Sequence, residues 1–242
     1  MQKIHLSVII PVFNEEKRIV NTLKEIDNYL KKQPFISEII VVSDGSTDRT
    51  CEVVEHLKSE IKNLNLICEK INRGKGYGVK VGMLKAMGEY RLFTDADNST
   101  PISEIEKFWT EFEKGADVVI GSRDLKGAIL EPPQPLFRRF VGEVFKYLRK
   151  LIVGMWDIED TQCGFKCFKG EIVEKIFSKA VIEKFSFDPE ILLIAKKMGF
   201  KIKEVPIYWK NDLGSKVKFK SMLEMLVDLI RIRINLLRKK YG

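Results

Sequence analysis

Residues 6–13 read LSVIIPVF, an apolar run rich in β-branched residues that is typical of a strand buried on both faces. Comparable runs follow at residues 38–43, 64–69, 90–94 and 117–121. Helical patterns lie between them, near residues 15–32, 47–62, 76–88 and 101–114, the last with Thr100 as N-cap and Pro101 at its first helical position. This alternation predicts an α/β fold in which helices cover both faces of a mostly parallel sheet.

The rest of the chain has a looser pattern. Residues 122–134 are expected to form a loop because they contain Gly127, Pro132 and Pro133. Helices are expected at 136–153 and near 170–178 and 188–199, then a strand at 201–205 and a long final helix. No break in composition marks a flexible linker. We therefore expect a domain over residues 1–215, with an amphipathic helix at 136–153, and a basic amphipathic helix at 216–242.

Composition excludes several classes of protein. The 242 residues are 45% hydrophobic and 31% charged, which is enough apolar content to build a core and excludes intrinsic disorder. No apolar run approaches the roughly 18 residues that span a bilayer. No secretory signal is evident, so we expect a cytoplasmic protein. Four cysteines are too few for a disulfide framework, and Cys163 and Cys167 lack the partners of a zinc site, so we expect a reducing compartment.

The net charge of +8 raises the question of a polyanionic partner. The basic residues gather at 136–150 and 216–240, among aliphatic residues with few aromatic platforms, and no usual nucleic-acid motif is present. We therefore expect no nucleic-acid partner.

Polar groups follow five of the expected strands. They are Asn14-Glu15-Glu16, Asp44-Gly45-Ser46, Asn72-Arg73-Gly74-Lys75-Gly76, Asp95-Ala96-Asp97 and Ser122-Arg123. Ligands of parallel α/β sheets bind at the carboxyl ends of the strands. This edge of the sheet is therefore the predicted functional site.

Each of these segments has two interpretations when it is taken alone. Asp95 and Asp97 can share a hard cation such as Mg²⁺ or Mn²⁺, or they can make a turn that caps a helix. The glycine-rich stretch at 72–78 can bind an anion or form a tight turn, and it does not match Gly-x-Gly-x-x-Gly. Asp44 can accept a hydrogen bond from a nucleobase or cap a helix.

Taken together and in this order, the segments resemble the family-two glycosyltransferases with the GT-A fold. The supporting motifs begin with residues 7–16, 42–48, 72–76, 95–97 and 119–123. Four further segments, at 160–166 (DTQCGFK), 187–190 (FDPE), 204–207 (EVPI) and 214–217 (GSKV), are similar to the branch of dolichyl-phosphate β-glucosyltransferase-like and other polyprenyl-phosphate glycosyltransferases.

The resemblance implies roles for named residues. Asp95 and Asp97 would hold the metal, Mg²⁺ or Mn²⁺, and Asp97, Arg123, Asp160 and Lys216 would be the catalytic set. The nucleotide-sugar donor would contact Pro11, Phe13, Glu15, Asp44, Lys75, Asp95 and Ser215, and the acceptor phosphate would contact Arg123, Arg138 and Arg139. Two departures, at 98–101 and at Asp124, put the identity of the donor in question.

The implied reaction moves a hexose, with UDP-glucose favoured as donor, onto a polyprenyl phosphate with inversion of configuration. Asp160 is interpreted as a base, as a stabiliser of positive charge on the sugar, or as a turn residue. The alternatives are a GDP-mannose-dependent mannosyl enzyme and a family-two enzyme with a soluble sugar, polysaccharide or protein acceptor.

The two basic segments also fit a membrane surface. At 216–240 an apolar stripe at helical spacing is accompanied by eight basic residues and two acidic ones, and 136–150 repeats this pattern. Such stripes more often pack in a core, but the lipid acceptor favours contact with an anionic membrane. We expect peripheral attachment and leave open a separate membrane-anchoring partner.

Overall fold

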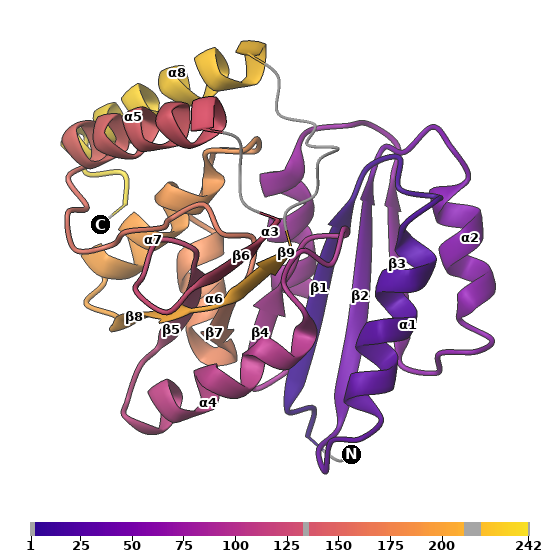
Figure 1. Ribbon diagram of the computed structural model, residues 1–242. Helices are drawn as coiled ribbons and strands as arrows, with labels where there is room; N and C mark the ends of the chain where they lie inside the picture. Colours follow the sequence, from indigo (N-terminus) through magenta and orange to yellow (C-terminus); the bar gives the residue numbers. More distant parts are fainter. Residues whose placement is uncertain (1–2, 133–135, 211–218, 242) are drawn as a thin grey trace.

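The computed structural model describes residues 3–132, 136–210 and 219–241, with the backbone alone at 136–141 and 219–222. Its first half alternates strand and helix as expected (Figure 1). The elements are β1 (Leu6–Val12), α1 (Ile19–Leu30), β2 (Ser37–Asp44), α2 (Thr50–Leu57), β3 (Leu64–Glu69), α3 (Lys75–Lys85), β4 (Tyr90–Phe93), a 3₁₀ turn (Ile102–Ile105), α4 (Glu106–Glu113) and β5 (Val118–Ser122).

The second half adds short strands and longer helices. It comprises β6 (Ile129–Glu131), α5 (Leu136–Val153), β7 (Lys166–Lys169), α6 (Gly170–Phe177), α7 (Phe187–Lys197), β8 (Ile202–Pro206), β9 (Tyr208–Lys210) and α8 (Phe219–Leu237). The boundary expected between residues 215 and 216 lies outside the described residues.

Seven strands form one sheet in the order β3-β2-β1-β4-β7-β5-β8, and β6 pairs with β9 in a second sheet. Within the large sheet only β7 runs antiparallel to its neighbours, β4 and β5. The predicted mostly parallel sheet is therefore confirmed. The expected strands do not include β6, β7 or β9, which are only three or four residues long.

Two apolar clusters cover the two faces of the sheet. Ile9 of β1 belongs to the cluster that includes α3, α6, α7 and α8, whereas Val8 and Ile10 belong to the cluster that includes α1, α2 and α4. This alternation follows from the two-residue period of a strand. It explains why the run at 6–13 is apolar throughout.

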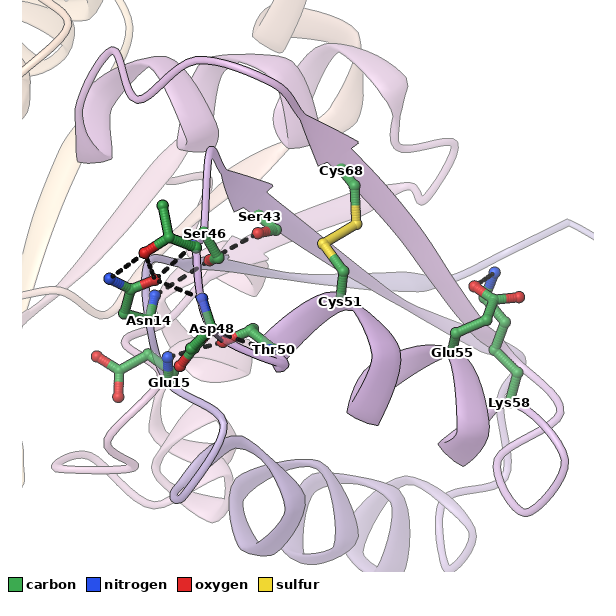
Figure 2. The surroundings of a disulfide bond; sticks show 11 residues. Asn14, Glu15, Ser43, Ser46, Asp48, Thr50, Cys51, Glu55, Lys58 and Cys68 are labelled. Atoms are coloured by element: carbon green, nitrogen blue, oxygen red, sulfur yellow. Dashed lines mark hydrogen bonds and ion pairs between the residues drawn. A yellow bond between two sulfur atoms is a disulfide. The ribbon is translucent and has the colours of Figure 1, made fainter.

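The helix start expected at Thr100 is wrong. Pro101 precedes the 3₁₀ turn, and the hydroxyl of Thr100 makes no hydrogen bond although it is buried. The expectation of a reducing compartment does not account for one pair of cysteines, because Cys51 of α2 and Cys68 of β3 form a disulfide (Figure 2). The fold brings their Cα atoms to 6.5 Å although 17 positions separate them in the chain.

Helices α5 and α8 pack side by side at one end of the molecule (Figure 1). Two of the basic residues of α5 whose side chains are described, Arg149 and Lys150, are buried, which corrects for them the expectation of a lipid surface. Arg149 is buried and donates to the carbonyl oxygens of Ile158 and Glu159, and Lys150 is also buried and pairs with the Glu159 carboxylate at 2.8 Å. Within the part of the chain that is described, no helix combines the length and apolar character needed to cross a bilayer.

Candidate active site

Hydrogen bonds tie the loop after β1 to the loop after β2 (Figure 2). The backbone N–H of Asn14 donates to Ser46 Oγ at 3.1 Å, and that of Glu15 donates to Thr50 Oγ1 at 2.9 Å. In return, the Thr47 N–H donates to Asn14 Oδ1 at 2.8 Å. The two loops therefore form one wall at the carboxyl edge of the sheet.

Asp44, at the end of β2, holds the turn that leads into α3. Its buried carboxylate accepts hydrogen bonds from the N–H of Arg73 at 3.0 Å and of Gly74 at 2.6 Å. Gly74 has φ +123°, and a Cβ there would lie 2.6 Å from the carbonyl oxygen of Glu183. A residue with a side chain would not fit this turn. The glycine-rich stretch is thus a tight turn into a helix.

The two carboxylates after β4 share a site with the first residue of α3. Lys75 Nζ lies 2.5 Å from Asp95 Oδ1, and the Ser99 N–H donates to Asp97 Oδ1 at 2.9 Å. Burial and the nearby Asp95 charge raise the pKa of Asp97. Burial disfavours the charged form of Lys75, but the carboxylates of Asp95 and Asp188 outweigh it and raise the pKa of the ammonium group.

A second, fully buried ion pair lies close to the first. Lys166 Nζ donates to Asp188 Oδ1 at 2.5 Å and also to the carbonyl oxygen of Cys163, and its side chain is wholly buried. Burial raises the pKa of Asp188, and the charges of Lys166 and Lys75 oppose this shift only in part. Gly164 lies so near Asp95 that a Cβ would approach Oδ2 to 2.1 Å. The segment 163–166 therefore packs directly against the Asp95 carboxylate.

Arg123 and Asp160 form a bidentate ion pair on the far side of β7. The two guanidinium contacts are 2.7 and 2.9 Å, and the backbone N–H groups of Gln162 and Cys163 also donate to Asp160. Although burial raises the pKa of Asp160, the charge of Arg123 and the hydrogen bonds that Arg123 donates lower this pKa well below its usual range. Arg123 also lies over the Trp209 ring, 4.8 Å from its centroid. Asp160 is therefore an ionised partner of Arg123.

The remaining predicted residues are more scattered. Pro11 is buried in β1 beneath Gly78, Phe13 is 40% exposed at the strand end, and the Glu15 carboxylate pairs with Arg18 at 2.8 Å. Four more predictions lie outside the described side chains, namely those at Arg138, Arg139, Ser215 and Lys216. The structure thus brings Lys75, Asp95 and Asp97 together and joins Arg123 to Asp160.

The sequence of this chain matches a known protein family and several named proteins. Residues 7–177 match the family model described as Glycosyl transferase family 2, which is more than half of the chain. The chain belongs to that family. This glycosyltransferase is 37% identical over 241 residues to a dolichyl-phosphate beta-glucosyltransferase of Trichomonas vaginalis, and the match covers 96% of this chain and 73% of that protein. The Homo sapiens protein of the same name is 34% identical over 256 residues, with 96% and 76% covered.

Solved structures show the same fold at low sequence identity. Mannosyl-3-phosphoglycerate synthase from Rubrobacter xylanophilus is 16% identical, with a TM-score of 0.68 over 98% of this chain and 75% of that one. Glucosyl-3-phosphoglycerate synthase from Mycobacterium tuberculosis, solved with Mn²⁺, UDP and phosphoglyceric acid, is also 16% identical, with a TM-score of 0.67 over 98% and 78%. The predicted GT-A fold and the predicted family are therefore both confirmed.

The residues of the glycosyltransferase fit a divalent cation at Asp95 and Asp97. These carboxylates lie together and already attract one cation, the Lys75 ammonium group. Among the described residues, no group of three or more His, Cys, Asp or Glu side chains could hold a metal. A protein site with two carboxylates suits Mg²⁺ or Mn²⁺, because these ions take their other ligands from substrate phosphates and water.

The motifs of this glycosyltransferase include Lys166 and Asp188, at 160–166 and 187–190, but they do not predict that the two side chains form an ion pair. A signal was nevertheless present, because Lys166 interrupts the apolar run from Phe165 to Phe168 and Asp188 follows Phe187. Ionisable residues in buried segments need partners of opposite charge. Which partners they find depends on the packing of β7 against α7.

Proposed function

We propose that the protein transfers glucose from UDP-glucose to a polyprenyl phosphate such as dolichyl phosphate. The observation that carries the proposal is the likeness of 96% of the chain to proteins named dolichyl-phosphate beta-glucosyltransferase in Trichomonas vaginalis, Homo sapiens and Saccharomyces cerevisiae. The paired carboxylates and cations at the carboxyl edge of the sheet supply chemistry suited to a diphosphate donor and a phosphate acceptor.

In the proposed reaction, an ionised oxygen of the lipid phosphate attacks the anomeric carbon of glucose. The bond from that carbon to the donor diphosphate breaks, and its electron pair leaves with UDP. The acceptor oxygen is already ionised near neutral pH, so no base is required. Direct displacement inverts the α linkage of UDP-glucose to β, in agreement with the names of the relatives.

We assign the described residues as follows. Pro11, Phe13, Glu15 and the turn held by Asp44 would border the nucleoside of the donor. Arg123 would bind phosphate oxygen, and Asp160 would hold its guanidinium plane in place. The low pKa of Asp160 supports this positioning role over that of a base. Arg138, Arg139, Ser215 and Lys216 remain proposed phosphate contacts.

A divalent cation at Asp95 and Asp97 would supply positive charge that stabilises the departing diphosphate. The fit of the two carboxylates supports this assignment, as does the Mn²⁺ with UDP in the mycobacterial structure of the same fold. Mg²⁺ and Mn²⁺ fit these oxygen ligands equally well.

The lipid acceptor requires access to a membrane, and α8 supports such a contact. One face of α8 packs in the core through Met225, Leu229 and Ile232. The opposite face exposes an aliphatic stripe, 42 to 68% exposed, made of Leu223, Val227, Ile230, Ile234 and Leu237. Basic side chains are exposed along the same helix and after it, at Arg231, Arg233, Arg238, Lys239 and Lys240.

Helix α5 extends this surface. Val144, Tyr147 and Leu151 are exposed on it, and Trp156 is exposed shortly after its end. Exposed aliphatic and aromatic side chains beside basic ones are typical of helices that lie in the headgroup region of anionic lipid. We propose that α5 and α8 place the enzyme on an anionic membrane surface as a peripheral protein.

Product analysis tests the reaction. Purified protein with UDP-glucose, Mg²⁺ or Mn²⁺ and dolichyl phosphate should form a β-linked glucolipid that thin-layer chromatography and NMR identify. Parallel assays with GDP-mannose, and with 3-phosphoglycerate as a soluble acceptor, test the alternatives. Transfer only to the soluble acceptor, or only from GDP-mannose, would refute the proposal.

Vesicle flotation tests the membrane surface. Val227→Glu/Ile230→Glu should reduce binding to vesicles of anionic phospholipid at least tenfold, because two charges must then enter the headgroup region. Met87→Glu is the matched control. Met87 is 69% exposed but does not belong to α5 or α8, and its N–H donates to Glu38 at the start of β2. Equal flotation of both variants would contradict the assignment.

A further inference from the structure

Five ionisable groups crowd together where the sheet meets α3 and α7. Lys75 pairs with Asp95 at 2.5 Å, Lys166 pairs with Asp188 at 2.5 Å, and Asp97 lies near enough to Asp95 for their charges to interact. The residues next to the two ion pairs pack closely, because Gly76 lies against the side chain of Phe187. A Cβ on Gly76, which follows Lys75, would lie 2.6 Å from the Cβ of Phe187, which precedes Asp188.

This crowding raises a question of charge. A buried ammonium group needs a carboxylate partner, because an uncompensated charge out of water is strongly destabilising. Lys75 is only 23% exposed and has Asp95 as its partner. The proposed function, on which this inference rests, assigns Asp95 and Asp97 as ligands of a divalent cation. Lys75 must then find another partner.

The structure offers one nearby. The carboxylates whose charges act most strongly on Lys75 are those of Asp95, Asp188 and Asp97. With Asp95 and Asp97 engaged by a cation, Asp188 is the one of these three that remains. Lys166 holds Oδ1 of Asp188, and the close packing of Gly76 against the Phe187 side chain keeps α3 and α7 adjacent. A change of side-chain rotamer, without movement of a helix, can therefore carry the ammonium group from one carboxylate toward the other.

We propose that Lys75 is a resident counterion that leaves Asp95 for Asp188 when a divalent cation binds, and that Asp188, fixed by Lys166, is the positioning residue that receives it. In the absence of the metal, Lys75 keeps the two carboxylates after β4 from repelling each other. In its presence, the Lys75–Asp188 contact keeps the ammonium charge compensated.

The exchange needs no proton. With every group ionised, three carboxylates and two ammonium groups leave the cluster with one net negative charge. A divalent cation that enters with the doubly negative diphosphate of a nucleotide sugar leaves this net charge unchanged.

Mn²⁺ binding measured by electron paramagnetic resonance, with UDP present and no acceptor, tests the exchange without catalysis. Lys75→Met removes the competing ammonium group and should tighten Mn²⁺ binding about tenfold. Asp188→Asn removes the alternative partner, holds Lys75 on Asp95 and should weaken Mn²⁺ binding about tenfold. The double variant Lys75→Met/Asp188→Asn should regain the affinity of Lys75→Met, because no ammonium group remains to be displaced.

Glu190→Gln is the matched control. Glu190 is a buried carboxylate on the same helix as Asp188, and it bonds Tyr241 and the N–H groups of Val181 and Ile182 rather than Lys75. This variant should lose thermal stability but keep wild-type Mn²⁺ affinity.

The remaining outcomes overturn the inference. Weaker or unchanged Mn²⁺ binding by Lys75→Met would show that Lys75 binds the donor diphosphate or takes no part, and this variant does not depend on the folding of Asp188→Asn. Equal affinities of Asp188→Asn and wild type would exclude Asp188 as the receiving group while leaving the proposed function intact. Transfer activity with no Mn²⁺ bound by the wild type would refute the exchange and the metal site but not the glucosyl transfer.

Discussion

Three aspartates of the candidate site, Asp97, Asp160 and Asp188, differ in acidity according to what surrounds them. Burial raises the pKa of Asp97 and of Asp188, and the cations beside them compensate only in part. For Asp160 the charge of Arg123 and the hydrogen bonds from its guanidinium group and backbone N–H outweigh burial and lower the pKa. A further cation nearby would therefore favour the ionised form of Asp97 and Asp188, whereas Asp160 is already ionised beside Arg123.

Asp160→Asn should destabilise the protein by about 3 kcal/mol, since it leaves the Arg123 charge without its partner. We take the lower end of the usual range because the Arg123 side chain is 23% exposed. For a protein of this size the loss corresponds to a fall in Tm of about 6–12 °C. Asp124→Asn is the control, because Asp124 lies 34% exposed and 3.4 Å from Lys146, and it should cost less than about 1 kcal/mol.

The same pair predicts a pH dependence. Because the folded-state pKa of Asp160 is lowered, its contribution to stability is present above the ordinary aspartate pKa of about 3.9 and is lost as pH falls below it. Wild-type Tm should therefore fall more steeply between pH 5 and pH 3 than that of Asp160→Asn. Parallel slopes in differential scanning calorimetry would contradict the assignment.

At the scale of elements, the Cys51–Cys68 disulfide fastens α2 to β3 beside the loops that border the proposed nucleoside site (Figure 2). For a loop of this length the disulfide should contribute about 3 kcal/mol, so Cys51→Ser/Cys68→Ser should lower Tm by about 6–12 °C. Dithiothreitol should lower the Tm of the wild type by a similar amount and leave the double variant unchanged.

Thiol titration checks the same disulfide independently. Cys163 and Cys167 are buried, and burial raises the pKa of Cys163 to about 12, so neither should react in the folded protein. The denatured protein should show two reactive thiols without reductant. Four thiols under that condition would refute the disulfide.

The segment after α8 is held to the core by the side chain of Tyr241. Tyr241 Oη donates to the buried Glu190 carboxylate at 2.6 Å, and the Asn235 amide donates to Tyr241 Oη at 3.2 Å. Tyr241→Phe should cost about 2 kcal/mol, as expected for a hydrogen bond to a charged group, and increase amide hydrogen exchange in α8. Tyr147→Phe, at an exposed tyrosine of α5, should change neither quantity.

At the scale of the molecule, the donor and the metal should stabilise the fold together. UDP with Mn²⁺ at about a hundred times its dissociation constant should add about 2.7 kcal/mol, which corresponds to about 5–11 °C in Tm. Either component alone should have a smaller effect, because the proposed metal ligands Asp95 and Asp97 would need phosphate oxygens to complete the ligand set. An equal shift by UDP in the presence of EDTA would contradict metal-linked binding.

Much of the architecture is predictable from local pattern. The apolar runs at 6–13 and 38–43 become β1 and β2, and the polar groups after five strands meet at one edge because those strands are parallel. The helix at 136–153 is predicted, but the burial of Arg149 and Lys150 is not. A helical period places residues on faces, and it does not say which neighbour each face meets.

The sequence by itself therefore determined the order of the helices and of strands β1 to β5 and β8, the edge that holds the candidate site and the family, since these follow from periodicity and from motifs read along the chain. Only the tertiary structure decided that Cys51 meets Cys68, that Lys166 meets Asp188, and that α8 has one aliphatic face in the core and another outside. Cys51 and Cys68, like Lys166 and Asp188, lie 17 or more positions apart in the chain and on different elements. Their contacts form only when the sheet has assembled. Each buried charge must then lie beside an opposite charge, because an unpaired buried charge is strongly destabilising.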